Sequence, residues 1–135
     1  MPKEDYLLKF LEKLGRVVAA MLGLREKGNV EDAIRLADET YKELLTLDMD
    51  ALSSLSIDDF EVLIRKLGYT STYIEALAKL MHETALCFAE TGESLKMRIF
   101  SEKALLLYCL LSEKDKTFSF EREMIIAELK QQIND

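Results

Sequence analysis

Residues 22–36 read Leu22-Gly-Leu-Arg-Glu-Lys-Gly-Asn-Val-Glu-Asp-Ala-Ile-Arg-Leu36, and residues 86–100 follow the same pattern as Leu86-Cys-Phe-Ala-Glu-Thr-Gly-Glu-Ser-Leu-Lys-Met-Arg-Ile-Phe100. Each stretch contains the end of an apolar-periodic segment, a glycine, and the start of a second such segment. Glycine adopts the left-handed conformation at little cost, so it lets the chain reverse after a helix. Gly28 and Gly92 are therefore predicted to be turns within helical hairpins, and Gly68 to end another helix in the same way.

Apolar residues repeat at three- and four-residue spacing along the whole chain, and nowhere do they alternate with the period of a strand. The pattern predicts helices over residues 4–27, 30–47, 57–67, 70–91 and 93–112, and a sixth helix after residue 119. Residues 48–55 are expected to form a loop. The candidate N-caps are Asn29, Ser56, Thr70 or Ser71, and Ser119. The predicted fold is all-α, with about six antiparallel helices stacked as hairpins in one domain that spans residues 1–135.

The charge of the chain argues against nucleic-acid binding. Its formal net charge is −7, whereas proteins that bind nucleic acids neutralise phosphates with Lys and Arg. The charge is uneven, because residues 31–61 carry ten acidic and two basic side chains. Two interpretations stay open: this region is a docking face for a basic partner, or it is an ordinary solvated surface.

The termini and cysteines favour a cytoplasmic protein. Met1 leads directly into charged residues rather than a secretory signal, and the longest apolar run is far shorter than a membrane helix. Cys87 and Cys109 both lie in apolar helical segments, where a thiol packs as a small hydrophobic group. No membrane association and no disulfide are expected.

The run Ala104-Leu-Leu-Leu-Tyr-Cys-Leu-Leu111 is apolar on every side of its predicted helix. One interpretation is a central helix, packed by the fourth and sixth helices and reached by the second. The other leaves one side for a partner or a second copy of the chain, in which case a homodimer forms and the interaction surface comprises Leu105, Leu107, Tyr108 and Leu111.

No sequence pattern indicates catalysis, a cofactor or a metal. Glycines are scattered, so no phosphate-binding loop is present, and no nucleophile motif occurs. His82 is the only histidine, and Lys79 stands where an ExxH metal motif needs a carboxylate. Cys87 follows His82 by five residues, a spacing that points the two side chains to different sides of one helix. We therefore expect no catalytic, cofactor-binding or metal-binding residues.

Parts of the two glycine hairpins resemble tetratricopeptide (TPR) repeats. Gly28 precedes Ala33 by five residues, and Gly92 is followed by Glu102-Lys-Ala-Leu105, as in parts of that pattern. The match is partial, since Met97 stands at a position where alanine is usual, and the two glycines are 64 residues apart. That separation is less than two repeats of about 34 residues, so the middle pair of helices is expected to break the phase of the repeat.

A second resemblance covers nearly the whole chain. It rests on Asp5-Tyr6, Leu14-Gly-Arg16, Leu22-Gly-Leu-Arg25, Leu44-Leu-Thr-Leu-Asp48, and Leu55-Ser56 ahead of an acidic helix start. These motifs look like a family of small bacterial TPR-like helical proteins that lacks an assigned activity. The resemblance implies an α–α superhelix and transfers no catalytic or ligand residues.

Stacked helical hairpins commonly bind other proteins, so the sequence favours a non-enzymatic protein–protein interaction module whose partner is an unknown protein or peptide. The alternative is a regulatory domain that binds a small molecule or peptide in a pocket between helices. That pocket would be lined by aromatic side chains chosen from Tyr6, Tyr41, Tyr69, Tyr73, Phe88 and Tyr108. An enzyme is the third interpretation.

Overall fold

The computed structural model describes residues 3–115 and 119–134, and these residues form helices without any strand. The predicted all-α fold is confirmed. The described part holds seven helices rather than six: α1 (Lys3–Glu26), α2 (Val30–Leu45), α3 (Met49–Ser54), α4 (Ile57–Leu67), α5 (Ser71–Glu90), α6 (Ser94–Lys114) and α7 (Phe120–Asn134).

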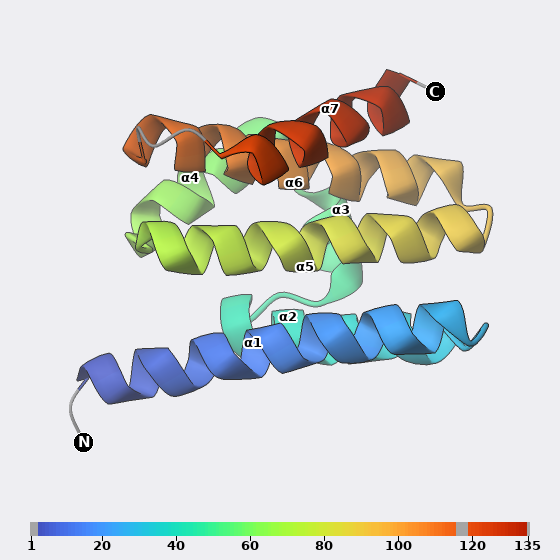
Figure 1. Cartoon of the computed structure of the whole chain (residues 1–135), viewed down its shortest axis with the longest axis horizontal. Coiled ribbons are helices and arrows are strands. Elements are labelled where there is room, and N and C mark those ends of the chain that lie inside the picture. The colour runs from blue at the N-terminus through green and yellow to red at the C-terminus, as the bar shows by residue number, and fades with distance from the viewer. Residues whose placement is uncertain (1–2, 116–118, 135) are drawn as a thin grey trace.

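Helix α5 lies at the centre of the fold (Figure 1). The antiparallel pair α1 and α2 packs along one side of α5, and α6 packs antiparallel along the other side. Helices α7, α4 and α3 then pack against α6. Because it has neighbours on both sides, α5 buries residues around much of its circumference, including Leu77, Leu80, Met81 and Phe88.

The predicted glycine turns are confirmed. Gly28, Gly68 and Gly92 all have left-handed φ angles, of 85°, 62° and 78°. Gly28 joins α1 to α2, and Gly92 joins α5 to α6, so each forms the turn of one antiparallel pair. Only glycine enters this conformation without strain from a Cβ atom.

Most of the predicted caps are confirmed. The side-chain oxygens of Ser56 and Thr70 accept hydrogen bonds from the backbone N–H groups of Asp59 and Tyr73, and that of Ser119 accepts one from Arg122. Asn29 occupies the N-cap position of α2, but its side chain makes no capping hydrogen bond.

The prediction of a loop over residues 48–55 is wrong, because Met49–Ser54 form α3. The Asp48 carboxylate caps this short helix by accepting a hydrogen bond from the Ala51 N–H at 2.8 Å. Met49 and Leu52 bury one face of it. Six residues are too few for the periodicity of a helix to stand out in a sequence, so the capping aspartate was its main sign.

The apolar run of 104–111 belongs mainly to the core. Leu107, Tyr108 and Leu111 are each at most 1% exposed, so the prediction that they form an interaction surface is wrong; Leu105 is half-buried. The run is covered by α5 and α7, and α2 reaches α6 through contact of the Tyr41 and Phe100 rings. The alternative of a central, covered helix is therefore the one that the structure supports.

Candidate functional site

A hollow of about 430 Å³ opens where α2, α3, the end of α5 and the start of α6 meet. We call it the junction groove. Its apolar floor is made by Ile34, Met49 and Phe88, and two cations and several carboxylates border it. Nothing in the described part of the chain fills it, and its volume falls in the range of ligand pockets.

The residues of α2 that line the junction groove lie on one face of that helix. Glu31, Ile34, Arg35 and Asp38 are spaced three and four residues apart, so they share one face of α2. Asp38 also fixes α3, because its Oδ1 accepts a hydrogen bond from the Met49 N–H at 2.8 Å. That bond is the main reason the pKa of Asp38 is lowered, and the ammonium of Lys42 lowers it further.

The α6 side of the junction groove holds one cation. Lys96 Nζ lies 5.5 Å from the centroid of the Phe88 ring and 3.5 Å from Glu93 Oε1. An ammonium between an aromatic face and a carboxylate is stabilised by both. The floor of the junction groove thus already accommodates a positive charge.

The carboxylates of the junction groove outnumber its cations. Glu31, Asp38, Asp48, Asp50 and Glu93 line it together with Arg35 and Lys96. The guanidinium of Arg35 pairs with Asp32 outside the lining, at 3.0 Å. Glu31 and Asp50 make no ion pair within the described residues, so their charges face solvent and any incoming ligand.

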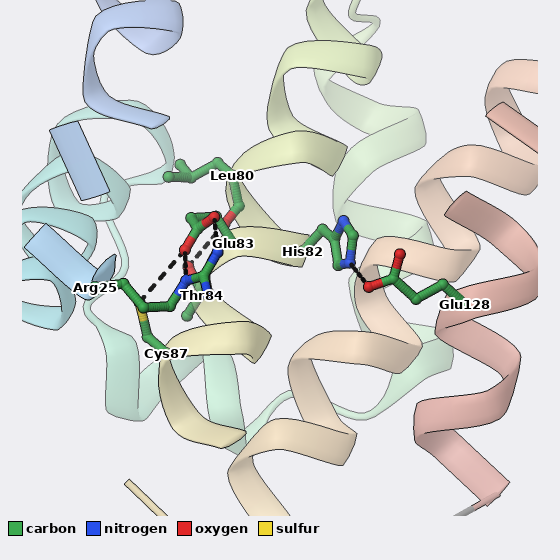
Figure 2. Close-up of polar contacts among 7 residues, drawn as sticks. All are labelled: Arg25, Leu80, His82, Glu83, Thr84, Cys87 and Glu128. Carbon is green, nitrogen blue, oxygen red and sulfur yellow. Dashed lines mark hydrogen bonds and ion pairs between the residues drawn. The ribbon is translucent and has the colours of Figure 1, made fainter. Parts of the chain in front are cut away.

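A buried ion pair joins α1 to α5 (Figure 2). Arg25 donates from Nε to Glu83 Oε2 at 2.6 Å and from Nη2 to Glu83 Oε1 at 3.2 Å, which is a bidentate arrangement. The Glu83 side chain is 7% exposed and that of Arg25 18%. The pair raises the pKa of Arg25, chiefly through the hydrogen bond to Glu83. Sequence reasoning missed this contact, although a glutamate within the apolar stripe of residues 77–88 was a signal for it.

Cys87 lies one helical turn beyond Glu83, with its Sγ 3.8 Å from Glu83 Oε2. Burial is the main cause that raises the pKa of the Cys87 thiol to about 12, and the Glu83 carboxylate adds to it. The thiolate is the nucleophilic form of cysteine. At neutral pH this side chain is a protonated thiol that packs between helices.

His82 points away from this cluster toward α7, as Figure 2 shows. Its Nε2 lies 3.5 Å from Glu128 Oε1. Burial lowers the pKa of His82, while the neighbouring Glu128 opposes that shift. The predicted separation of His82 and Cys87 is confirmed, since His82 faces Glu128 of α7 whereas Cys87 lies beside Glu83, on the side of α5 that meets Arg25.

Tyr41 and Thr84 link α2 to α5 inside the core. The Tyr41 Oη and Thr84 Oγ1 atoms are 2.8 Å apart, and Thr84 lies within hydrogen-bond distance of the Leu80 carbonyl, also at 2.8 Å. Burial raises the pKa of Tyr41, so its hydroxyl stays protonated. This contact orients the two helices and has no opening to solvent.

The aromatic residues predicted to line one pocket do not converge. Phe88 lies in the floor of the junction groove, whereas Tyr69 lines a separate hollow between α4 and α6, with its ring tilted against that of Tyr73 and the centroids 4.0 Å apart. Tyr41 and Tyr108 are in the core, and Tyr6 is 62% exposed. A shared aromatic pocket is therefore absent from the described structure.

The described residues were also compared with the requirements of a metal site, a membrane-spanning helix and a disulfide. Within residues 3–115 and 119–134, no group of three or more His, Cys, Asp or Glu side chains is placed to hold a metal ion. None of the described helices is both long enough and apolar enough to cross a membrane. Cys87 is a buried free thiol, and Cys109 is an exposed one.

Comparison with known proteins adds no family or relative: no family model, no curated protein and no solved structure matches this chain. The junction groove is the structural feature from which a function can be inferred. The resemblance to TPR-like proteins stays a hypothesis.

Proposed function

We propose that this chain is a non-enzymatic protein–protein interaction module, and that it binds a segment of its partner in the junction groove. The observation that carries this proposal is the groove itself: an apolar floor with a charged rim, formed where the consecutive helices α2 and α3 meet the consecutive helices α5 and α6. Sites for peptide segments combine an apolar floor for an anchoring side chain with polar groups that fix orientation.

The packing around the groove supports this role. Asp38 ties α3 to α2, and the caps at Asp48 and Gly92 fix the ends of the helices that border it. A site held in this way is formed before the partner arrives, which lowers the cost of binding. The only histidine, His82, and the buried cysteine, Cys87, lie outside the groove, beside Glu128 and Glu83 respectively.

Site-specific photo-cross-linking tests the proposal. A photoreactive residue at Arg35, which lines the groove, is compared with one at Lys130, an exposed position on α7. In lysate of the source organism, we expect discrete protein adducts at residue 35 that weaken when Ile34→Ala reduces the apolar floor. Equal adduct patterns at both positions, or adducts indifferent to Ile34→Ala, would contradict the groove as the binding site.

A second hollow favours the alternative of a domain that binds a small molecule or peptide. It has about 420 Å³ between α1 and α5, and its lining is mainly apolar, with Leu11, Leu14, Val18 and Ala76. The affinity for a ligand of this hollow should fall in the Ala76→Leu variant, because the larger side chain reduces the space. The same affinity should not change in the Ile34→Ala variant. A second copy of the chain is the other candidate occupant, and light scattering at increasing protein concentration detects it.

A further inference from the structure

We infer that the segment bound in the junction groove is a basic protein segment: several Lys or Arg side chains flanking one apolar side chain. This inference rests on the proposed function and names the chemistry of the partner. It is carried by the charge around the groove, by the helix ends that meet there, and by the Lys96 contact on its floor.

The acidic surface extends beyond the groove. Another hollow lies at the turn between α1 and α2 and is distinct from the one between α1 and α5. It shares Glu31 with the junction groove and adds the carboxylates of Asp32 and Glu90. Seven carboxylates border the two hollows, against the cations of Arg35 and Lys96. Seven carboxylates against two cations leave an excess of five negative charges around the two hollows. The whole chain has a formal net charge of −7, so most of that excess charge lies in this region.

Helix dipoles explain the position of some of these acids but do not neutralise them. The N-termini of α2, α3 and α6 border the hollows, as do the C-termini of α1 and α5. Each end carries at most about half an elementary charge, so three positive and two negative ends nearly cancel. Lys42 also pairs with Asp38 at 3.2 Å, so after Arg35, Lys96 and Lys42 are counted, roughly three to four negative charges are left uncompensated.

One cation, Lys96, is already bound at the floor of the junction groove. Lys96 Nζ of this chain lies over the Phe88 ring and 3.5 Å from Glu93 Oε1. Its side chain is 41% exposed, so it can move aside. Phe88 is only 2% exposed, so an incoming Lys or Arg side chain reaches the ring by exchanging with Lys96, and it then makes the same cation–π contact and the ion pair with Glu93.

The apolar part of the floor distinguishes a protein segment from a small polycation. Ile34 and Met49 offer no charge to a polyamine, whereas they can contact an apolar side chain of a peptide. The groove is too small for a folded domain and large enough for a few side chains. A segment with one apolar residue between basic residues therefore fits both its surface and its charge.

The test uses fluorescence anisotropy of the full chain with labelled nonapeptides at physiological ionic strength. The probe carries four lysines around a central leucine, with serine elsewhere. Its matched forms replace leucine by serine, or lysine by glutamate. We expect the basic leucine peptide to bind most tightly, the serine form more weakly, and the acidic form not at all. Raising the salt concentration should weaken binding.

Two pairs of substitutions locate the site. Glu31→Gln with Asp50→Asn removes two unpaired groove charges, and Glu39→Gln with Glu123→Gln removes two exposed charges elsewhere. We expect the groove pair to weaken binding about fivefold and the control pair less than twofold, since each exposed ion pair with the peptide that is lost weakens binding by roughly two- to fivefold. Circular dichroism confirms that both variants are folded.

Three outcomes overturn the inference: the basic peptide fails to bind, both pairs of substitutions weaken it equally, or spermine displaces it as effectively as unlabelled peptide. The last result would assign the surface to small polycations. Cross-links at residue 35 that depend on Ile34, found together with rejection of the basic peptide, would leave the proposed function standing and overturn only the charge of the partner.

Discussion

Replacing Arg25 by alanine should lower the free energy of unfolding by about 3 kcal/mol. Breaking a buried ion pair by removing one partner typically costs 3 to 5 kcal/mol, because the remaining charge stays buried without compensation. Here the bidentate contact is short and Glu83 is almost fully buried, but Arg25 is 18% exposed, so water can partly replace it. The lower end of the range therefore applies.

The assay is urea unfolding followed by circular dichroism, analysed with a two-state model. The loss should also appear as a fall in melting temperature of about 10 °C for a domain of this size. Arg25→Met combined with Glu83→Met should recover most of the loss, since an apolar pair of similar volume removes the uncompensated charge.

The double variant also measures the coupling between the two residues. Additive effects of Arg25→Met and Glu83→Met would show that the side chains do not interact in solution. A loss below about 1 kcal/mol for Arg25→Ala, the range typical of exposed pairs, would refute the assignment of this contact as a buried ion pair.

The remaining predictions concern the turns, the core hydroxyl pair and pH. Gly28→Val and Gly92→Val should each destabilise the fold by about 1 to 2 kcal/mol, because both glycines have left-handed φ angles; unchanged melting would contradict this. Tyr41→Phe should cost about 1 kcal/mol by removing the hydrogen bond to Thr84, and a neutral result in urea unfolding would show that this bond contributes nothing net. Burial lowers the pKa of His82 below the ordinary value of a histidine, about 6.5, so on acidification the unfolded chain binds this proton first. Stability should therefore fall as the pH drops below about 6.5, and His82→Gln should reduce that slope; an unchanged slope would exclude His82 as its source.

Local signals in the sequence predicted the helices well. Gly28, Gly68 and Gly92 take the predicted conformation, and Ser56 and Thr70 cap the helices that follow them. Each of these features depends on a few neighbouring residues, so it is visible without the fold. The helix of residues 49–54 was missed because it is too short to display a period.

Contacts between distant residues could not be predicted in the same way. Arg25 and Glu83 are 58 residues apart, and only the packing of two helices brings them together. The run of residues 104–111 showed that its helix is apolar on all sides, but not that neighbouring helices cover most of it. Likewise, the acidic composition of residues 31–61 was evident, whereas its convergence with Phe88 and Glu93 in one groove required the structure.

Nuclear magnetic resonance of the isotope-labelled full chain, titrated with the basic leucine nonapeptide, tests the central claim most directly. Chemical shifts should change mainly at the floor of the junction groove, at Ile34, Met49 and Phe88, and saturate with one affinity. Leu129, buried on α7 away from the groove, should not change. Shifts spread over acidic residues of the whole surface, or concentrated between α1 and α5 at Leu11 and Ala76, would contradict the junction groove as the binding site.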